Sequence, residues 1–287
     1  MRSARIHRHG DPSVIEIDDI PRPLPAGGEV LVEVAATSFN PTETALRSGA
    51  LRSLFPIALP CTLGWDVAGT VAGRPVIGWL ERGAAAEYAV APHGRLVPAP
   101  ASIPLPDAAA IPLAGLTAWQ VVVPHVSAGQ RVLINGAGGG IGGFAVQLAK
   151  RAGAHVIATA SARSADAVRR QGADEIIDYT KESVATAVEP VDVLIHLVGT
   201  PPPWTPPVRR SGTIVSAAAP VTAPPGVTST HVVVRYDVAQ LTELVHLVDA
   251  GAVTVDVTET HPLDGLADVH RRSEAGDVRG KVTIRCR

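Results

Sequence analysis

A run of glycines between an apolar strand and an amphipathic segment constrains this chain more than any other feature. The sequence RVLINGAGGGIGGFAVQLAK spans Arg131 to Lys150. Its first part, Val132 to Ile134, is short and β-branched, as a buried parallel strand is, and the part after the glycines is typical of an amphipathic helix. Gly138, Gly140 and Gly143 fit GxGxxG where strand turns into helix.

This spacing has a mechanical reason in proteins that bind dinucleotides. We expect Gly138 to permit a tight turn, Gly140 to let backbone N–H groups approach a pyrophosphate, and Gly143 to allow close packing of helix on strand. The pyrophosphate would lie at the positive end of the helix. The segment therefore predicts a phosphate-binding loop that also includes Gly139 and Ile141.

The elements after this loop favour a Rossmann sheet. A strand at His155 to Ala160, a polar helix at Ala165 to Gln171 and a strand at Glu175 to Tyr179 complete a βαβαβ unit. Two further buried strands, Val191 to Val198 and Gly212 to Ala217, extend the sheet.

Proline shapes the chain between and after these two strands. The prolines of Pro201 to Arg210 forbid a regular helix over most of that stretch, so we expect a long loop in place of a crossover helix. A last strand is expected at His231 to Arg235 and an amphipathic helix at Val238 to Ala250. From Val253 onward the chain returns to turns, one helix and a terminal strand.

The first hundred residues follow a different pattern, in which Gly and Pro separate short strands. The strands are expected at Val14 to Ile17, Glu29 to Ala36, Trp65 to Ala72, Val76 to Leu80 and Ala86 to Val90. A short helix is expected around Pro41 to Arg47, and two helical segments, Pro106 to Ile111 and Leu113 to Val123, lead into the glycine loop. The N-terminal part is therefore predicted to be a compact β domain.

Length and composition narrow the class of protein. A chain of 287 residues favours two domains. Hydrophobic residues make up 46% and no apolar run reaches the ~20 residues of a membrane span, so we expect a soluble protein without a membrane partner. The net charge of −2 comes from interspersed charges, which argues against nucleic acid as a partner.

The N-terminus and the cysteines indicate a compartment. No apolar segment follows MRSARIHRHG, so we expect no signal peptide and a cytoplasmic location. Cys61 and Cys286 lack Cys or His partners at ligand spacing, which argues against a disulfide framework and a structural zinc.

Several motifs besides the glycine loop are spread over nearly the whole chain. They are NPTETALRSG from Asn40, GWDVAGTV from Gly64, AAAIPLAGLTAW from Ala108, GADEIIDY from Gly172 and RGKVTI from Arg279. Together, and in this order, they resemble the zinc-independent quinone oxidoreductase branch of the medium-chain dehydrogenase/reductase superfamily.

The resemblance implies an α/β protein with a GroES-like β domain and a Rossmann domain with a doubly wound parallel sheet. Residues 1–113 and 255–287 would form the first, catalytic domain and residues 114–254 the second, with the active site in the cleft. It implies an enzyme that transfers a hydride from a nicotinamide to a quinone or an α,β-unsaturated carbonyl. Zinc-dependent relatives place a Cys near position 40 and Gly-His-Glu at 64–66, and this chain has neither, so we expect no metal.

The end of the second Rossmann strand bears on which nicotinamide is used. It reads ATASARS, with a hydroxyl at Ser161, a guanidinium at Arg163 and no carboxylate before Asp166. A 2′-phosphate needs donors and positive charge, whereas an unphosphorylated ribose is usually held by Asp or Glu. NADPH is therefore favoured, with Tyr179 closing the pocket.

Further cofactor contacts are implied by the resemblance alone. Asn40 and Thr117 would lie near the nicotinamide and the phosphates, and Val198 with Gly199 near the nicotinamide ribose. The nicotinamide edge would be lined by Ser216, Ala217, Val232 and Val233.

The reaction puts negative charge on an acceptor oxygen, so the site needs a donor there and finally a proton. Many relatives have a Tyr shortly after the RSG element, where this chain has Leu51. Asn40 is the candidate hydrogen-bond donor and either Arg47 or Arg52 the candidate for balancing charge, while the proton would come from solvent. His196 stands where relatives often have Asp and is interpreted as a satisfied buried histidine.

Three functions remain open on the sequence. The first is an NADPH-dependent reductase of quinones or enones. The second is an enoyl reductase of a polyketide or secondary-metabolite pathway, and the third a non-catalytic NADPH-binding sensor.

A homodimer is expected, with the apolar strand near His231 pairing across a two-fold axis.

Overall fold

The computed structural model describes residues 1–205 and 207–287, so Pro206 of the expected proline-rich loop lies outside the described residues. The chain divides into two compact units, residues 1–113 with 236–287 and residues 114–235. The sequence assigned residues 236–254 to the Rossmann domain, whereas the structure groups them with the first unit. The reason is helix α7 (Val238–Asp249), since Asp249 Oδ1 accepts hydrogen bonds from the backbone N–H groups of Ala101 and Ser102, both at 2.8 Å.

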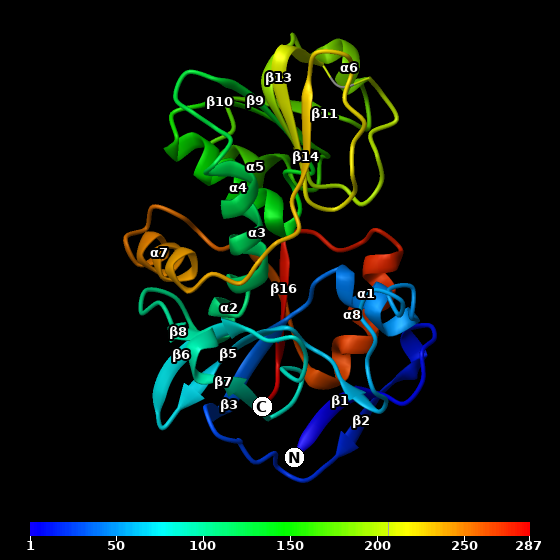
Figure 1. The fold of residues 1–287 in the computed structure, drawn as a ribbon, viewed down its shortest axis with the longest axis vertical. Helices are drawn as coiled ribbons and strands as arrows, with labels where there is room; N and C mark the ends of the chain where they lie inside the picture. Colours follow the sequence, from blue (N-terminus) through cyan, green and yellow to red (C-terminus); the bar gives the residue numbers. More distant parts are fainter. Residues whose placement is uncertain (206) are drawn as a thin grey trace. The chain divides into compact units, whose positions relative to one another are not determined.

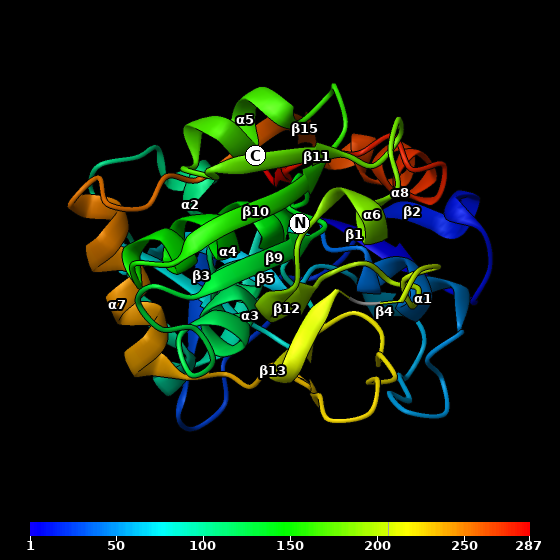
Figure 2. The same ribbon diagram turned by 90° about the horizontal axis from the view of Figure 1, so that it is seen from above.

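The second unit is built on a six-stranded parallel sheet in the order β11-β10-β9-β12-β13-β14. Figure 2 shows the first five of these strands side by side in this order. This is the doubly wound order, with β9 and β12 at the point where the chain direction along the sheet reverses. The strands are β9 (Arg131–Asn135), β10 (His155–Ala160), β11 (Glu175–Asp178), β12 (Val191–His196), β13 (Val208–Ser216) and β14 (Thr228–His231). The helices are α3 (Pro112–Val122), α4 (Gly140–Arg151), α5 (Ala165–Arg170) and α6 (Val184–Ala187).

The sheet forms where the sequence has short β-branched runs. Val193, Leu194 and Ile195 of β12 pair in register with Val132, Leu133 and Ile134 of β9, and all six side chains are buried. Strands buried on both faces need continuous apolar runs, which these two have. The prediction of a Rossmann sheet is confirmed.

The last strand of this sheet lies earlier than predicted. It ends at His231, so the strand expected at His231 to Arg235 is wrong beyond its first residue. The backbone of Arg235 binds a side chain instead of a neighbouring strand: its C=O accepts from Gln120 Nε2 at 2.7 Å and its N–H donates to Gln120 Oε1 at 3.0 Å. Both backbone groups are therefore satisfied without a ladder.

Loops replace two crossover helices of the second unit. The described residues between β12 and β13, and those between β13 and β14, contain no helix. Trp204, Val221, Ala223 and Val227 from these loops pack against a buried cluster of the sheet that includes Leu194. The expected helix-free connection is thus confirmed for the described residues, although β13 begins at Val208, earlier than predicted.

The first unit contains two mostly antiparallel sheets. A small sheet has the order β2-β1-β4, and a larger one the order β15-β16-β3-β5-β6-β8, with β7 also paired to β3. The small sheet consists of β1 (Arg2–Ile6), β2 (Ile15–Asp19) and β4 (Cys61–Thr62), and the larger of β3 (Glu29–Ser38), β5 (Asp66–Val71), β6 (Arg74–Trp79), β7 (Tyr88–Pro92), β8 (Leu96–Pro98), β15 (Val257–Pro262) and β16 (Lys281–Arg285). Figure 1 shows β16, from the end of the chain, in the same unit as β3 from its beginning. Their antiparallel pairing confirms that the C-terminal segment returns to the first domain.

Helices and an apolar core complete the first unit. The helices are α1 (Thr42–Ser48), α2 (Leu105–Ala108), α7 and α8 (Leu266–Glu274), with 3₁₀ turns at Pro12–Val14, His93–Arg95 and Leu263–Gly265. Val32, Val67 and Ile284 from three neighbouring strands are each fully buried in one cluster with Val269 of α8. Strands β1, β4, β8 and β15 were not predicted, because none of them has a strict alternation of apolar residues.

A tight hairpin follows Val71 and joins β5 to β6. Strands β5 and β6 are joined by Ala72 and Gly73, whose φ angles are 49° and 76°. Positive φ at both central residues is typical of a type I′ turn, which matches the twist of the flanking strands. Two residues therefore suffice to connect the strands.

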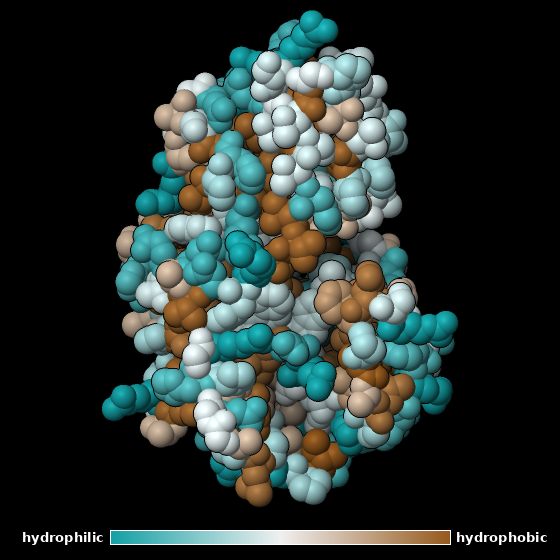
Figure 3. Space-filling model, viewed as in Figure 1, coloured by the Kyte–Doolittle hydropathy of each residue, from teal (hydrophilic) through white to brown (hydrophobic). Residues whose placement is uncertain are grey.

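No helix among the described residues is long and apolar enough to cross a membrane. On the face shown in Figure 3, hydrophobic residues are interspersed with hydrophilic ones. Scattered exposed apolar side chains of this kind are normal on a protein surface.

Candidate cofactor and active site

The predicted cofactor contacts of the second unit come mostly from one edge of its sheet. The carboxyl ends of parallel strands meet at a single edge, which is where dinucleotides bind in doubly wound folds. The predicted residues that directly follow strands β9 to β14 there are Gly138, Gly139, Gly140, Ile141, Ser161, Arg163, Tyr179, Val198, Gly199, Ala217, Val232 and Val233. Most are exposed or half-buried, and Tyr179 is 54% and Val233 70% exposed.

Two predicted contacts are less accessible. Thr117 on α3 is 5% exposed, and Ser216 at the end of β13 is fully buried. The Ser216 hydroxyl lies 3.0 Å from Nδ1 of His231, and its backbone C=O accepts from Val232 N–H at 2.8 Å. The backbone and neighbours of Ser216, rather than its hydroxyl, are thus what this edge presents.

The glycine loop has the predicted form with a shifted register. The positive φ, 95°, belongs to Gly136 and not to Gly138. A Cβ on Gly142 would lie 2.3 Å from the carbonyl oxygen of Gly136, whereas one on Gly143 would first meet the flexible side chain of Gln171 at 2.8 Å. The roles of tight turn and close packing therefore belong to Gly136 and Gly142.

The N-terminus of α4 is shaped to receive an anion. Gly139 is its N-cap residue and makes no side-chain cap. Helix geometry leaves the N–H groups of the first turn without intrahelical partners, and the helix dipole favours negative charge there. With no Cβ at residues 138–140, a pyrophosphate fits this end of the helix.

The region after β10 lacks a carboxylate that would favour an unphosphorylated ribose. Ser161 and Arg163 follow the strand, and the nearest acid in sequence, Asp166, forms an ion pair with Arg169 at 2.8 Å. Ser164 is buried and its Oγ accepts from the Ser161 N–H at 3.3 Å. The Ser161 hydroxyl and the Arg163 guanidinium are donors of the kind that a phosphate needs.

A chain of hydrogen bonds crosses the ends of three strands at this edge. The Gly136 N–H donates to Thr159 Oγ1 at 3.0 Å, and Thr159 Oγ1 donates to Asn135 Oδ1 at 2.9 Å. Asn135 Nδ2 lies 3.0 Å from His196 Nδ1, and His196 Nε2 lies 2.8 Å from the Thr200 carbonyl oxygen. His196 is fully buried with both ring nitrogens bonded, as interpreted from the sequence.

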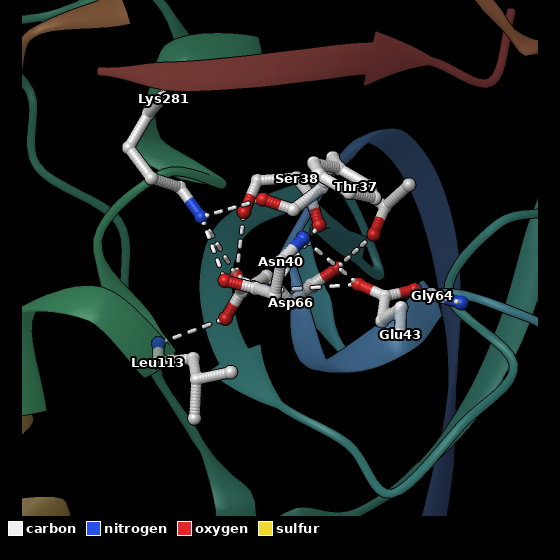
Figure 4. A network of polar contacts seen from close by, with 9 residues as sticks. Thr37, Ser38, Asn40, Glu43, Gly64, Asp66, Leu113 and Lys281 are labelled. Atoms are coloured by element: carbon white, nitrogen blue, oxygen red, sulfur yellow. Dashed lines mark hydrogen bonds and ion pairs between the residues drawn. The ribbon is translucent and has the colours of Figure 1, made fainter. Parts of the chain in front are cut away.

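The first unit holds a buried network of polar side chains around Asp66. Figure 4 shows Asn40, Glu43, Asp66 and Lys281 pointing toward one another. Asp66 is fully buried, and its Oδ2 accepts from Ser38 Oγ at 2.5 Å and from Asn40 Nδ2 at 2.9 Å. Its Oδ1 accepts from the backbone N–H of Leu113 at 2.8 Å. Such donors satisfy a carboxylate that has lost its water.

Lys281 supplies the positive charge of this network. It is 4% exposed, and its Nζ lies 3.7 Å from Asp66 Oδ2. The ammonium also donates to Asn40 Oδ1 at 2.8 Å and to the Phe39 C=O at 3.0 Å. Burial lowers the pKa of Lys281, while the carboxylates of Asp66 and Glu43 oppose that shift.

The side-chain amide of Asn40 is therefore mostly used within the network, with Nδ2 bonded to Asp66 and Oδ1 to Lys281. Asn40 is 5% exposed. One Nδ2 hydrogen serves Asp66, and the remaining contacts of Nδ2 are longer, 3.3 Å to the Ser38 C=O and 3.4 Å to Glu43 Oε1. Only the second Nδ2 hydrogen is weakly held, so this is the one that a further acceptor can take.

The structure does not support the predicted charge-balancing role of Arg47. Its side chain is 1% exposed, and its guanidinium pairs with Glu274 of α8. A guanidinium buried between helices and paired there does not face a reacting molecule. Arg47 links α1 to α8 instead.

Glu43 of α1 is the most strongly perturbed acid of the network. It is 1% exposed. Burial, together with the nearby Asp66 carboxylate, raises the pKa of Glu43 to about 8, although hydrogen bonds from Asn40 and Gly64 oppose this shift. The Gly64 N–H donates to Glu43 Oε2 at 3.1 Å.

The raised pKa makes stability depend on pH. Between the ordinary pKa of 4.5 and about 8, the folded protein holds a proton on Glu43 that the unfolded chain releases. We expect the free energy of unfolding to fall as the pH rises through this window, by up to about 1.4 kcal/mol per pH unit from this group. Urea unfolding from pH 5 to pH 8.5 measures it.

The control for this prediction is a pair of variants. Glu43→Gln is expected to flatten the pH dependence, because the amide does not titrate. Glu182→Gln, at an exposed acid, is expected to keep the wild-type slope. Parallel curves for wild type and Glu43→Gln would show that Glu43 titrates at an ordinary pH in the folded protein.

Sequence reasoning missed the partners that hold these sites together. Asp66 and Lys281 are both inside motifs that carried the family resemblance, but neither was assigned a role. The Thr159 and Asn135 side chains gave no local signal either. A charged residue within an apolar strand was the available hint, since buried charges are nearly always paired.

Comparison with known proteins agrees with this geometry. Residues 26–75 match the alcohol dehydrogenase GroES-like domain family, and residues 171–284 match a family described as zinc-binding dehydrogenase. The chain is 30% identical to the chloroplast envelope quinone oxidoreductase homolog of Arabidopsis thaliana, over 96% of this chain and 95% of that protein. It is also 30% identical to an NADPH-dependent alkenal/one oxidoreductase, chloroplastic, of the same plant, over 89% of this chain and 72% of the relative.

A solved structure is similar over the whole chain. The quinone oxidoreductase of Escherichia coli complexed with NADPH superimposes with a TM-score of 0.88 at 26% identity, covering 99% of this chain and all of the other. A GroES-like unit and a doubly wound dinucleotide-type sheet define a medium-chain dehydrogenase/reductase. Within that superfamily, the chain belongs to the quinone oxidoreductase branch.

Proposed function

We propose that this protein is an NADPH-dependent oxidoreductase that transfers a hydride to a quinone or an α,β-unsaturated carbonyl. The observation that carries the proposal is the edge of the parallel sheet in the second unit, where the glycine loop opens the N-terminus of α4 and no carboxylate follows β10 directly. The names of the relatives support the same chemistry.

The chain's own residues have three tasks in this reaction. NADPH, when bound, supplies the hydride. The glycine loop and the α4 N-terminus hold the pyrophosphate, and Val198, Gly199 and Ala217 line the nicotinamide side of the edge. The second Nδ2 hydrogen of Asn40 is proposed to donate to the acceptor oxygen as negative charge develops there.

The proton that completes the reduction is proposed to come from solvent. Leu51 stands at about the place where many relatives have Tyr. Leu51 carries no ionisable group. In an enone the hydride adds to the β-carbon and the proton goes to the α-carbon, and in a quinone the proton goes to the oxygen that hydride transfer leaves negatively charged; water can supply that proton in both cases.

A catalytic zinc does not fit the residues at the corresponding positions. Residues 40, 65 and 66 are Asn40, Trp65 and Asp66. Zinc is bound by Cys, His and carboxylate groups. The carboxylate of Asp66 is already occupied by Ser38, Asn40 and the cation of Lys281, so we propose zinc-independent chemistry. Activity that survives prolonged treatment with a strong chelator is the expected result.

The test of the proposed function is an acceptor screen with NADPH. Simple quinones, enones and enoyl thioesters are compared under steady-state conditions, following NADPH oxidation. Turnover of quinones or enones with higher kcat/KM than enoyl thioesters is expected. The opposite order would favour the enoyl reductase, and tight NADPH binding without oxidation by any acceptor would favour a sensor.

Arg163 provides a prediction for cofactor choice. Arg163→Ala is expected to weaken NADPH binding by about tenfold or more and to leave NADH binding unchanged, since a charge-assisted hydrogen bond contributes about 1.5–3 kcal/mol. Fluorescence titration with both cofactors measures the change. Arg151→Ala, at an exposed position at the C-terminal end of α4, is the matched control. Equal losses for NADPH and NADH would contradict the assignment of Arg163 to the 2′-phosphate.

Assembly and location are further proposals. Strand β14 forms one edge of its sheet, and an exposed edge is a template for pairing with a second copy. We propose a homodimer through β14, tested by light scattering on the purified protein. Cys61 and Cys286 are free and buried, which is compatible with a reducing compartment such as the cytoplasm.

A further inference from the structure

The hydrogen-bond chain from Gly136 to Thr200 has a fixed direction. Thr159 Oγ1 accepts from the Gly136 N–H, so its single hydrogen is free to go to Asn135 Oδ1. The Asn135 amide then presents Nδ2, a donor, to His196, whose Nδ1 must accept. The hydrogen of the neutral imidazole is thereby placed on Nε2, where the Thr200 carbonyl oxygen accepts it.

Each end of the hydrogen-bond chain is a backbone group in a different loop that is proposed to contact NADPH. Gly136 is the positive-φ residue that begins the glycine loop after β9. Thr200 closes the short segment after β12 that contains Val198 and Gly199, both exposed. His196 lies between the two loops, at the ends of the two strands where the doubly wound order reverses.

The surroundings of His196 keep the ring neutral. It is fully buried, and burial lowers the pKa of His196 while hydrogen bonds to the backbone of Thr200 and Val198 oppose that shift. A protonated Nδ1 would lose its acceptor function toward Asn135. The neutral ring with hydrogen on Nε2 is the one form that satisfies both partners.

We infer that His196 is a positioning residue, which fixes the glycine loop and the Val198–Gly199 loop relative to each other for NADPH binding. This inference rests on the proposed function. Nδ1 of the imidazole accepts from the Asn135 side chain, which is connected through Thr159 to the Gly136 N–H, and Nε2 donates to the Thr200 carbonyl oxygen, so this one side chain joins the two loops. Loops fixed before binding lower the entropy that binding must remove.

Two variants of His196 separate the contacts. His196→Phe keeps a planar ring and removes both hydrogen bonds, so the NADPH Kd is expected to rise about tenfold, equivalent to about 1.4 kcal/mol. His196→Asn retains an acceptor near the position of Nδ1 and loses the donor toward Thr200. Its Kd is expected to rise only about threefold, which is about 0.65 kcal/mol.

A double-mutant cycle tests whether the chain is continuous. Thr159→Val removes the link to Gly136 and is also expected to raise the NADPH Kd about tenfold. If Thr159 and His196 act through one chain, the double variant loses about tenfold and not the hundredfold of independent sites. His125→Phe, a half-buried histidine of the same unit outside the chain, controls for loss of an imidazole.

A readout in the cofactor-free protein does not depend on activity. Amide hydrogen exchange at Gly136 is expected to become about tenfold faster in His196→Phe and to stay unchanged in His125→Phe. Circular dichroism and melting temperature establish that each variant is folded at the titration temperature. Because His196→Asn keeps one of the two hydrogen bonds, the difference between its NADPH Kd and that of His196→Phe tests the inference even where His196→Phe is less stable.

The outcomes distinguish this inference from the proposed function. Wild-type protein that binds no NADPH contradicts the proposed function. Wild type that binds NADPH, with a His196→Phe variant of unchanged Kd and unchanged Gly136 exchange, overturns the positioning role alone. Additive losses in the double variant, or equal Kd values for His196→Phe and His196→Asn, overturn it as well.

Discussion

Replacing Lys281 with methionine is expected to lower the free energy of unfolding by about 3–5 kcal/mol. Methionine is close in length to the lysine stem, so the change mainly removes the charge. It leaves the carboxylate of Asp66 without the cation that lies 3.7 Å from it, in a place where neither residue is more than 4% exposed. It also removes the donor to Asn40 Oδ1 and to the Phe39 C=O, so two further buried acceptors lose a partner. Urea unfolding at pH 7 measures the loss.

The control variants for Lys281 separate charge from packing. In the double variant Lys281→Met with Asp66→Asn, the unpaired charge is gone, so the combined loss is expected to be smaller than the sum of the single losses. Lys181→Met removes an exposed lysine that pairs with Asp178 at the surface, and a change within about 0.5 kcal/mol is expected. A Lys281→Met variant as stable as wild type would show that the buried pair contributes nothing to the fold.

The elements of the Rossmann unit were predictable because each has a strong local pattern. Strand β10 was predicted at its observed bounds, His155 to Ala160, since an apolar β-branched run between a glycine turn and a polar helix has few other interpretations. The strand near His231 was misplaced because Val232 to Val234 is an equally apolar run. Its backbone is satisfied by a tertiary contact from Gln120, which is distant in sequence.

The active-site partners were harder to predict for a related reason. Lys281 and Asn40 are 241 residues apart, and the antiparallel pairing of β16 with β3 brings their segments together. A single sequence records which residues are charged but not which buried partner each one meets. The same limit applies to Arg47, whose pairing with Glu274 of α8 replaced the predicted contact with a reacting molecule.

The glycine loop was recognised correctly and read in the wrong register. With Gly136, Gly138, Gly139, Gly140, Gly142 and Gly143 in eight positions, more than one set of glycines fits a spaced pattern. The backbone decides between the sets, because positive φ and close backbone contact are properties of particular positions. These properties belong to Gly136 and Gly142, which changes the expected outcome of mutagenesis.

Gly142→Ala is expected to raise the NADPH Kd at least about a hundredfold. It is also expected to lower the free energy of unfolding by about 2–3 kcal/mol. The new Cβ would lie 2.3 Å from the Gly136 carbonyl oxygen and 2.5 Å from that of Ala137. Both are backbone atoms of the loop, so relief requires moving the α4 N-terminus away from β9. Fluorescence titration and urea unfolding measure the two effects.

Gly143→Ala is the matched comparison, one residue further along the same helix. Its Cβ would meet only the end of the Gln171 side chain, at 2.8 Å from Nε2, which rotates away at little cost. Alanine also favours the helix over glycine by about 1 kcal/mol, so the net change in stability is expected to stay within about 1 kcal/mol. The GxGxxG register of Gly138, Gly140 and Gly143 makes the opposite prediction, with the larger loss at Gly143. A larger loss in Gly143→Ala than in Gly142→Ala would therefore restore that register, because it would place the close backbone approach at Gly143.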